Sequence, residues 1–520
     1  MIDGHSSDQP LTPQSAPFTN VESDFVRALP TFAKDENFRW SEAAQEEYSP
    51  QPSTSAHWHY ISRQFTFASP HSAIALPSAI HLVHALQTEV KEGRKKGSVD
   101  GYLVKMYEMA TDSEKELFKL VNAGAVPTLI HLLKVRAAEQ YGVEIVLINL
   151  GTFAARDPIS ANAIHRTGTA ITLVELFNSP PTDVVQTLAI WCLTLICRSA
   201  EVANSLIKLN IASILVRVQA RIGPIMPAIS IFFLGTLIRS DSLAEFLVSL
   251  GFAQTICTHL RQCSELYVPN PESVSAGLYA VARMSRSIPL AKTLAKNGCV
   301  EVIAHHLKTS TDPEVLHWSA RAVGCLMKPN SSDLVKILLD ADIAKGLARL
   351  PTVLPPESLH PLESFGFAIQ RFSCAEWGSS TRKALVEAGV VDSLLAPFRP
   401  AVDERRHNVH VELALAVCLL GGVGGSSIRK EIVNAGGIEI LKSAGAAGSP
   451  DVTKACNMAV SSITGNLFSR SVATAKAAMA HKWSGGCPDY YTECPLTITE
   501  EQDSRKCMMC TEICGAGGFV

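Results

Sequence analysis

The cysteines near the end of the chain are the residues best suited, by type and spacing, to hold a metal ion. Cys507 and Cys510 form a C-x2-C pair, whose two thiolates can bind one tetrahedral zinc ion. Cys514 with Cys494 or Cys487 would complete four ligands, and His481 is a spare ligand. A zinc site built from two C-x2-C pairs would need a second such pair, but Cys487 and Cys494 are separated by six residues. Three interpretations stay open: a structural zinc element, a disordered reduced tail, and reversible acylation of Cys507 or Cys510.

The sequence contains none of the common catalytic motifs. It has no G-x-x-x-x-G-K-[ST] phosphate loop, no G-x-S-x-G nucleophile elbow and no H-E-x-x-H zinc helix. The glycine-rich stretch 421–425 lacks the strand and the G-x-G-x-x-G spacing of a dinucleotide site. We therefore predict a protein that is not an enzyme and has no cofactor apart from the zinc considered above.

Composition and charge restrict the class of partner. Hydrophobic residues make up 47% of the 520 residues, charged residues only 18%, and the net charge is −3, so no basic field favours nucleic acid. The uncharged run 222–238 contains Pro224 and Pro227 and is short for a membrane span, which favours a buried helix. We predict a cytoplasmic protein without a membrane span. The basic stretch 91–97 is either an inter-helix loop or a nuclear-import signal, which would add the nucleus.

The stretch 117–134 shows the unit from which most of the chain is built. A short apolar helix runs into Asn122-Ala123-Gly124, and Gly124 can adopt the left-handed conformation that ends a helix and bends the chain. Pro127 then lies near the start of a second helix, where its missing N–H costs little. Apolar residues in that second helix recur at i, i+3, i+4 and i+7, which predicts one buried stripe.

The same unit returns at intervals of 41 to 47 residues, each copy being followed by a longer third helix. The bend position is Gly in six copies, and Asn or Asp, the next best residues at positive φ, in the other two. A period near 45 predicts an α-solenoid. The eight bend residues are Gly124, Gly168, Asn210, Gly251, Gly298, Asp342, Gly389 and Gly436.

Three helices per copy, with a bend after the short first one, resemble the armadillo repeat over roughly residues 75–470. The resemblance implies an all-α fold: a right-handed superhelical solenoid of about eight three-helix repeats with an incomplete N-terminal cap. We expect a disordered acidic leader with an aromatic patch over 1–72, the repeat domain over 73–482, and a Cys-rich tail over 483–520. The Ala-rich stretch 469–483 should cap the stack.

In the armadillo family the third helices line a concave groove, where importers carry W-x-x-x-N pairs. Here only Trp191 matches the Trp slot and only Asn149 the Asn slot, in different repeats, which argues against an import receptor. The remaining groove candidates are aromatic or basic and suit an extended acidic segment with an apolar anchor. The alternative is that they pack between repeats. These candidates are Phe232, Tyr279, Arg283, Arg321, Phe367 and Arg371.

The resemblance and the missing catalytic parts predict a protein-interaction scaffold or adaptor that binds a protein segment along this groove. The alternative function is an armadillo-type co-chaperone or nucleotide-exchange factor that cradles a folded client. A further hypothesis concerns the leader: residues 1–60 carry nine acidic and three basic residues and could occupy the groove. The identity of the partner and the oligomeric state do not follow from the sequence.

Overall fold

The computed structural model describes residues 78–92, 96–139, 142–197, 200–222, 228–266, 270–327, 331–355, 357–374, 378–399 and 406–483. Within these ranges the secondary structure is helical and contains no strand. The predicted leader (1–72) and all of the predicted tail (483–520) except Trp483 lie outside the described residues. The same holds for the zinc candidates Cys494, Cys507, Cys510 and Cys514.

The helices follow one another as the period predicts: a pair, then successive groups of three, then a last helix. The pair is α3 (Ala79–Lys91) and α4 (Lys96–Asp112). The first four groups are α5 (Glu114–Asn122), α6 (Ala125–Glu139) and α7 (Val143–Arg156); α8 (Pro158–Arg166), α9 (Thr169–Asn178) and α10 (Asp183–Ile196); α11 (Ala200–Lys208), α12 (Ile211–Ile222) and α13 (Ala228–Leu237); α14 (Asp241–Ser249), α15 (Phe252–Glu265) and α16 (Pro271–Met284).

The later groups are more irregular in their second helices. They are α17 (Ile288–Lys296), α18 (Cys299–Thr309) and α19 (Pro313–Leu326); α20 (Ser332–Asp340), α21 (Ile343–Ala348) with α22 (Leu350–Val353), and α23 (Leu359–Cys374); α24 (Ser379–Glu387), α25 (Val390–Leu395) with the 3-10 turn η2 (Ala396–Phe398), and α26 (His407–Val423); α27 (Gly425–Asn434), α28 (Gly437–Ala447) and α29 (Pro450–Thr464). Helix α30 (Leu467–Trp483) follows. Pro351 and Pro397 lie where the two irregular second helices break, as expected for a residue that cannot donate an N–H.

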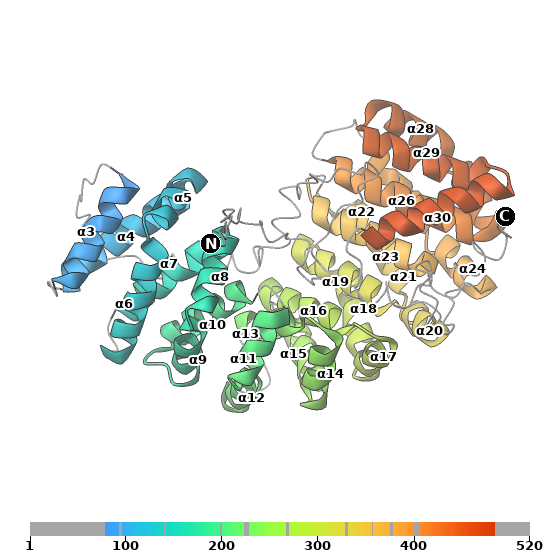
Figure 1. Ribbon diagram of the computed structural model, residues 1–520. Helices are drawn as coiled ribbons and strands as arrows, with labels where there is room; N and C mark the ends of the chain where they lie inside the picture. The colour runs from blue at the N-terminus through green and yellow to red at the C-terminus, as the bar shows by residue number, and fades with distance from the viewer. Residues whose placement is uncertain are drawn as a thin grey trace, which may run out of the picture.

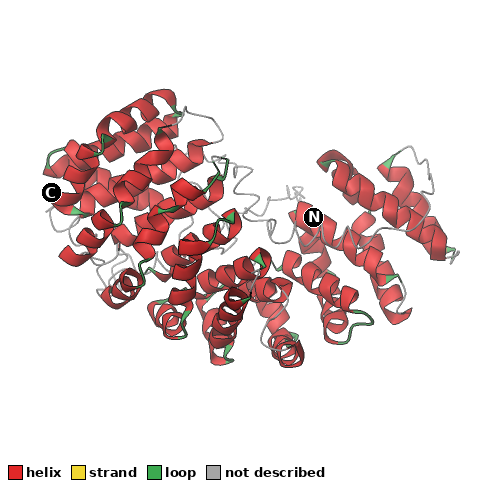
Figure 2. Cartoon of the chain, turned by 180° about the vertical axis from the view of Figure 1, so that it is seen from behind, coloured by secondary structure: helices red, strands yellow, loops and turns green. Residues whose placement is uncertain are grey.

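The groups stack side by side into a curved arch (Figure 1). Third helices such as α13, α16 and α19 lie on the inner side of the arch, and first helices such as α14, α17 and α20 lie on its outer side. The view from behind shows the same uninterrupted stack of helices (Figure 2). One continuous apolar core runs from Ala79 to Ala477, so the chain is a single solenoid and not two separate lobes.

The predicted bends are confirmed at every position. Each of the eight residues has positive φ, from 61° at Asp342 to 90° at Gly124, and Asn210 and Asp342 are the non-glycine residues with positive φ among those described. Asn and Asp tolerate the left-handed region better than other side chains do. The carboxylate of Asp342 also accepts hydrogen bonds from Lys308 and Lys345, at 3.2 and 3.1 Å. The bend sequence therefore fixes where each first helix gives way to the second.

Within the described residues, no single helix is both long and apolar enough to cross a bilayer. Helices α14 and α15 pass the test of length and composition when counted together, but they meet at an angle of 76°.

Candidate functional site

The inner row of third helices is the surface on which the sequence places the groove. All eight groove candidates lie on these helices, but their side chains are almost completely buried, with exposed fractions of 0% to 7%. Most of these side chains contact a helix of the neighbouring repeat. The structure therefore supports the alternative of packing between repeats for these side chains, and a contact with a partner stays a prediction. The eight are Asn149, Trp191, Phe232, Tyr279, Arg283, Arg321, Phe367 and Arg371.

Three aromatic rings form a row across α13, α16 and α19. The rings of Phe232 and Tyr279 stack with centroids 4.5 Å apart, and Trp318 meets Tyr279 edge to face at 4.9 Å. Such pairs contribute about 0.5–1.5 kcal/mol each beyond their buried area. The Trp318 indole N–H donates to Glu314 at 2.6 Å. Sequence analysis missed Trp318, although it lies one helical turn before Arg321 in the same third helix.

Glycines on one third helix make room for the aromatic ring of the next. A Cβ at Gly151 would lie 1.7 Å from the ring of Trp191, and one at Gly235 would lie 2.7 Å from Tyr279. The same relation joins Gly324 to Phe367, at 2.4 Å. These distances are far below van der Waals contact, so the aromatic residues fit only because the facing position has no side chain.

The next part of the inner row is a stack of guanidinium groups on an aromatic ring. Arg321 of α19 lies 4.1 Å from the centroid of the Phe367 ring, and Arg371 lies 5.1 Å from it. Cation–π contacts of this kind are favourable by about 0.5–2 kcal/mol, more when they are buried. Together with the row Phe232, Tyr279 and Trp318, this stack forms a path of aromatic and cationic side chains on four successive third helices, α13, α16, α19 and α23.

Arginines also tie the end of one third helix to the repeat before it. Each guanidinium donates a hydrogen bond to a backbone carbonyl at the C-terminal end of α4, α10 or α13, the inner helix of the preceding group. The last carbonyls of a helix have no partner within the helix, and the helix dipole favours a positive charge there. The prediction that Arg283 presents its charge to a groove therefore needs correction, because this guanidinium caps a helix. The pairs are Arg156 with Ala110 (2.6 Å), Arg239 with Cys197 (2.7 Å), and Arg283 with Ile238.

Asn149 is also engaged inside the stack. Its side-chain amide donates to the carbonyl of Leu103 on α4 at 3.1 Å and to that of Ile145 at 2.9 Å. The residue is fully buried. It thus joins two neighbouring repeats, which is a different role from holding the backbone of a bound peptide.

A polar cluster that the sequence did not reveal lies on α23 and α26. The Gln370 side chain donates to the carboxylate of Glu412 at 2.6 Å and to its backbone carbonyl at 2.9 Å. Glu363, Ser364 and Arg371 are buried on the same helix α23. From the sequence, charged and polar residues on a helix are expected on its exposed face. That these residues are buried becomes visible only when the neighbouring helix is in place.

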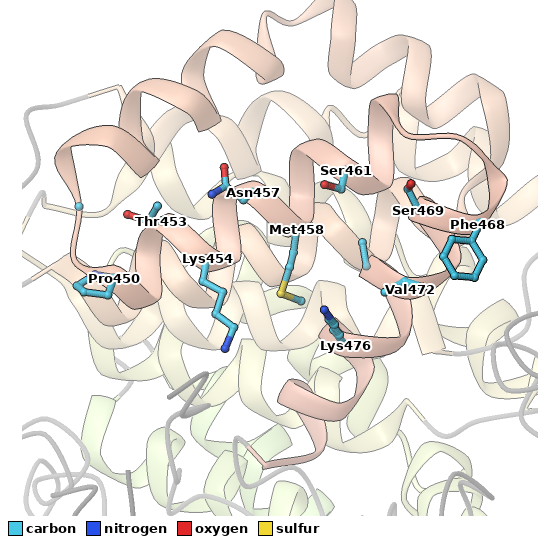
Figure 3. Close-up of a pocket in the computed structure, with 12 residues that line it drawn as sticks. Pro450, Thr453, Lys454, Asn457, Met458, Ser461, Phe468, Ser469, Val472 and Lys476 are labelled. Atoms are coloured by element: carbon cyan, nitrogen blue, oxygen red, sulfur yellow. The ribbon is translucent and has the colours of Figure 1, made fainter. Parts of the chain in front are cut away.

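The described residues contain a pocket of about 730 Å³ between α29 and α30 (Figure 3). Met458, Phe468 and Val472 supply apolar surface, and Lys454 and Lys476 supply positive charge. A smaller hollow of about 460 Å³ lies between the outer helices α20 and α24. Among the described residues no cluster of three His, Cys, Asp or Glu side chains could hold a metal ion.

Comparison with proteins of known structure supports the description of the fold. No protein-family model and no curated protein matches the sequence. An engineered protein of known crystal structure has a TM-score of 0.55 and 21% identity, over 85% of this chain and 100% of its own. A designed armadillo repeat protein gives a TM-score of 0.36 at 15% identity, over 57% of this chain and 100% of its own. A second designed armadillo repeat protein, solved in complex with the peptide (KR)4, has a TM-score of 0.32 and 17% identity, over 56% of this chain and 98% of its own. The three-helix repeat and its left-handed bends, with the first of these likenesses, show that the chain has an armadillo-like helical-repeat fold.

Proposed function

We propose that the protein is a non-enzymatic interaction scaffold that binds an extended segment of another protein along the inner side of its arch. The observation that carries this proposal is the path of aromatic and guanidinium groups over α13, α16, α19 and α23. An extended chain rises about 3.3 Å per residue, so a segment lying across stacked helices meets side chains of several repeats. Protein scaffolds of this kind need no reacting group.

The chemistry of the path favours a segment with carboxylates and aromatic side chains. Arg321 and Arg371 carry fixed positive charge beside the Phe367 ring, and because both are buried this charge acts on the carboxylates of a ligand through its electrostatic field. Phe232 and Tyr279 are 6% and 7% exposed as whole residues, so a ligand would touch only a small part of either. The small exposed area predicts that binding depends on the stack as a unit and less on any one ring.

A binding measurement on the full chain tests this function. We expect a fluorescein-labelled (Glu-Phe)4 peptide to bind more tightly than (Lys-Phe)4, as measured by fluorescence anisotropy. The variant Arg321→Gln/Arg371→Gln should weaken (Glu-Phe)4 binding at least tenfold, which is about 1.4 kcal/mol. Exposed Arg217 and Arg261 give the matched control, Arg217→Gln/Arg261→Gln. Equal affinity of the two peptides, or of the two variants at equal thermal stability, would contradict the proposal.

The alternative is a folded client cradled by the arch, as a co-chaperone or exchange factor would hold it. Excess (Glu-Phe)4 should displace an extended segment from the inner path, while a folded client held mainly by the rim would stay bound. We also propose a cytoplasmic location, with the nucleus as a second one. Structural zinc in the tail remains part of the proposal, and elemental analysis of the purified chain tests it.

A further inference from the structure

The pocket at the C-terminal end of the stack is formed by a helical hairpin. Helices α29 and α30 are separated by only Gly465 and Asn466. The stripe Lys454, Met458 and Ser461 on α29 and the stripe Phe468, Val472 and Lys476 on α30 both line it. These spacings of three, four and eight residues keep each stripe on one face of its helix. No further repeat follows α30 among the described residues, so this face ends the stack.

The pocket joins an apolar area to a cationic one. Figure 3 shows Phe468 at one end, Lys454 toward the other, and Met458 and Lys476 between them. Phe468 is 77% exposed and Val472 is 36% exposed. Exposed apolar side chains beside a pocket are candidates for contact with another segment. A ligand that fits must therefore combine an apolar or aromatic group with negative charge.

The sequence around the pocket has a sharp change of charge at residue 483. From Val452 to Trp483 it has four Lys and Arg residues and no Asp or Glu. From Ser484 to Ser504 it has five Asp and Glu residues and no Lys or Arg. Two tyrosines, Tyr490 and Tyr491, lie among these carboxylates. The segment after α30 thus carries both properties that the pocket requires.

The length of chain also matches the distance to be covered. Phe468 lies fifteen residues before the end of α30, which is about 22 Å at 1.5 Å per residue. Tyr490 lies seven residues after Trp483, and seven extended residues span about 23 Å. With about two residues used for a turn after Trp483, Tyr490 reaches about 16 Å back along α30, the level of Val472, and Tyr491 comes one residue closer to Phe468. A tether this short gives an effective concentration in the millimolar range, which an independent partner would have to exceed.

We propose that residues 488–493 of the same chain dock into this pocket. A tyrosine of the 490–491 pair packs against Phe468 and Val472, and the carboxylate of Asp489, which precedes the pair, bonds with Lys476. The segment would then cover the open end of the solenoid, as a polar-faced terminal repeat does in other solenoids. This proposal is independent of the function proposed for the inner side of the arch.

Photo-crosslinking in the full chain tests the docking. Benzoylphenylalanine replaces Val472, and the cross-linked peptides are identified by mass spectrometry in an equal mixture of light and heavy-isotope chains. We expect cross-links to residues 484–504 of the same chain. Benzoylphenylalanine at Tyr491 should give the reverse cross-link, to α29 or α30. Cross-links to the second copy, cross-links to residues 1–72, or none from either position would overturn the proposal.

A charge exchange separates docking from a general effect on the fold. Lys476→Glu should reduce the cross-link yield at least fivefold, because this side chain is exposed and its reversal removes the attraction. Adding Asp489→Lys to the same chain should restore the yield. The control Lys208→Glu changes an exposed lysine of a distant repeat and should leave it unaltered. Failure of the second exchange to restore the yield would overturn the pairing.

Discussion

Gly151 on α7 leaves the space that the indole ring of Trp191 on α10 fills. A Cβ at position 151 would lie 1.7 Å from Cζ3 of the ring, and Trp191 is only 3% exposed. The two residues are forty positions apart in the sequence, yet the indole ring fits only because position 151 has no side chain. The same pairing of a small residue with a large one recurs at Gly235 with Tyr279, and it sets how closely successive inner helices approach.

Gly151→Ala should therefore destabilise the stack. Alanine would ordinarily stabilise a helix interior by about 0.5–1 kcal/mol over glycine. Overpacking against a buried ring costs about 1–3 kcal/mol, and the steric term wins because a fixed indole cannot move aside. We expect a lower urea midpoint, equivalent to a net loss of about 1–2 kcal/mol. Trp191→Leu in the same chain should remove most of the penalty; an additive double variant would contradict the contact.

The bends could be predicted from the sequence because they depend on single residues. Positive φ is a property of the backbone at one position, and Gly, Asn and Asp adopt it most easily. Gly298 and Asn210 therefore mark their bends without any knowledge of their neighbours, and both have positive φ in the structure. Helix order follows from the same local signals together with apolar periodicity.

The orientation of the inner side chains could not be predicted in this way. Periodicity assigns Arg283 to a face of its own helix, but the acceptor of its hydrogen bond is Ile238, which belongs to the preceding repeat. The sequence leaves Tyr279 open between ligand surface and packing, because nothing in its own repeat shows that Gly235 faces it. These contacts form only when neighbouring repeats pack together. Because the partners lie about 45 residues apart in the sequence, local patterns do not reveal them.

Arg239 joins two repeats through backbone carbonyls, and its removal should be costly. Its guanidinium donates to Cys197 at 2.7 Å and to Thr236 at 2.9 Å, and the side chain is 6% exposed. Arg239→Met keeps the apolar stem but leaves these buried carbonyls unpaired, which costs about 1–3 kcal/mol. We expect a lower thermal midpoint for this variant. Arg217→Met, at an exposed arginine that bonds Asn178, is the control and should change the midpoint little.

The stability of the stack should fall in weak acid because of His306. Burial, together with the neighbouring His305, lowers the pKa of His306 to about 4, against about 6.5 in an unfolded chain. Between pH 6.5 and pH 4 the unfolded chain binds a proton at this histidine and the folded chain does not. The free energy of unfolding therefore has its full value above pH 6.5 and decreases as the pH falls toward 4. The full effect is about 3 kcal/mol.

Unfolding by urea at pH 7.5 and pH 5 measures this dependence. His306→Gln keeps a polar group near Ser264, which lies 2.8 Å from His306 Nε2, and should reduce the difference between the two pH values. His131→Gln replaces an exposed histidine and should retain the whole difference. A pH dependence that is unchanged in His306→Gln would show that another group is responsible.

Thiol labelling should separate the cysteines of the repeats from those of the tail. Eight cysteines of the described repeats are buried, and burial raises the pKa of Cys263 to about 11 and that of Cys418 and Cys456 to about 12. Since the thiolate is the reactive form, iodoacetamide at pH 8 should leave these thiols unlabelled in the folded chain. Denaturation in guanidinium should expose all 14 cysteines to the reagent.

The same experiment decides whether the tail holds zinc. Without a metal, Cys494, Cys507, Cys510 and Cys514 should react at the rate of ordinary thiols, because no coordination blocks their thiolates. Zinc bound by these thiolates would slow their labelling, and a chelator would restore it. Slow labelling that persists after chelation would contradict zinc binding and point to burial or acylation. Fast labelling of the tail with and without the chelator would exclude the metal, since a tetrahedral site cannot hold zinc and leave its thiolates free to react.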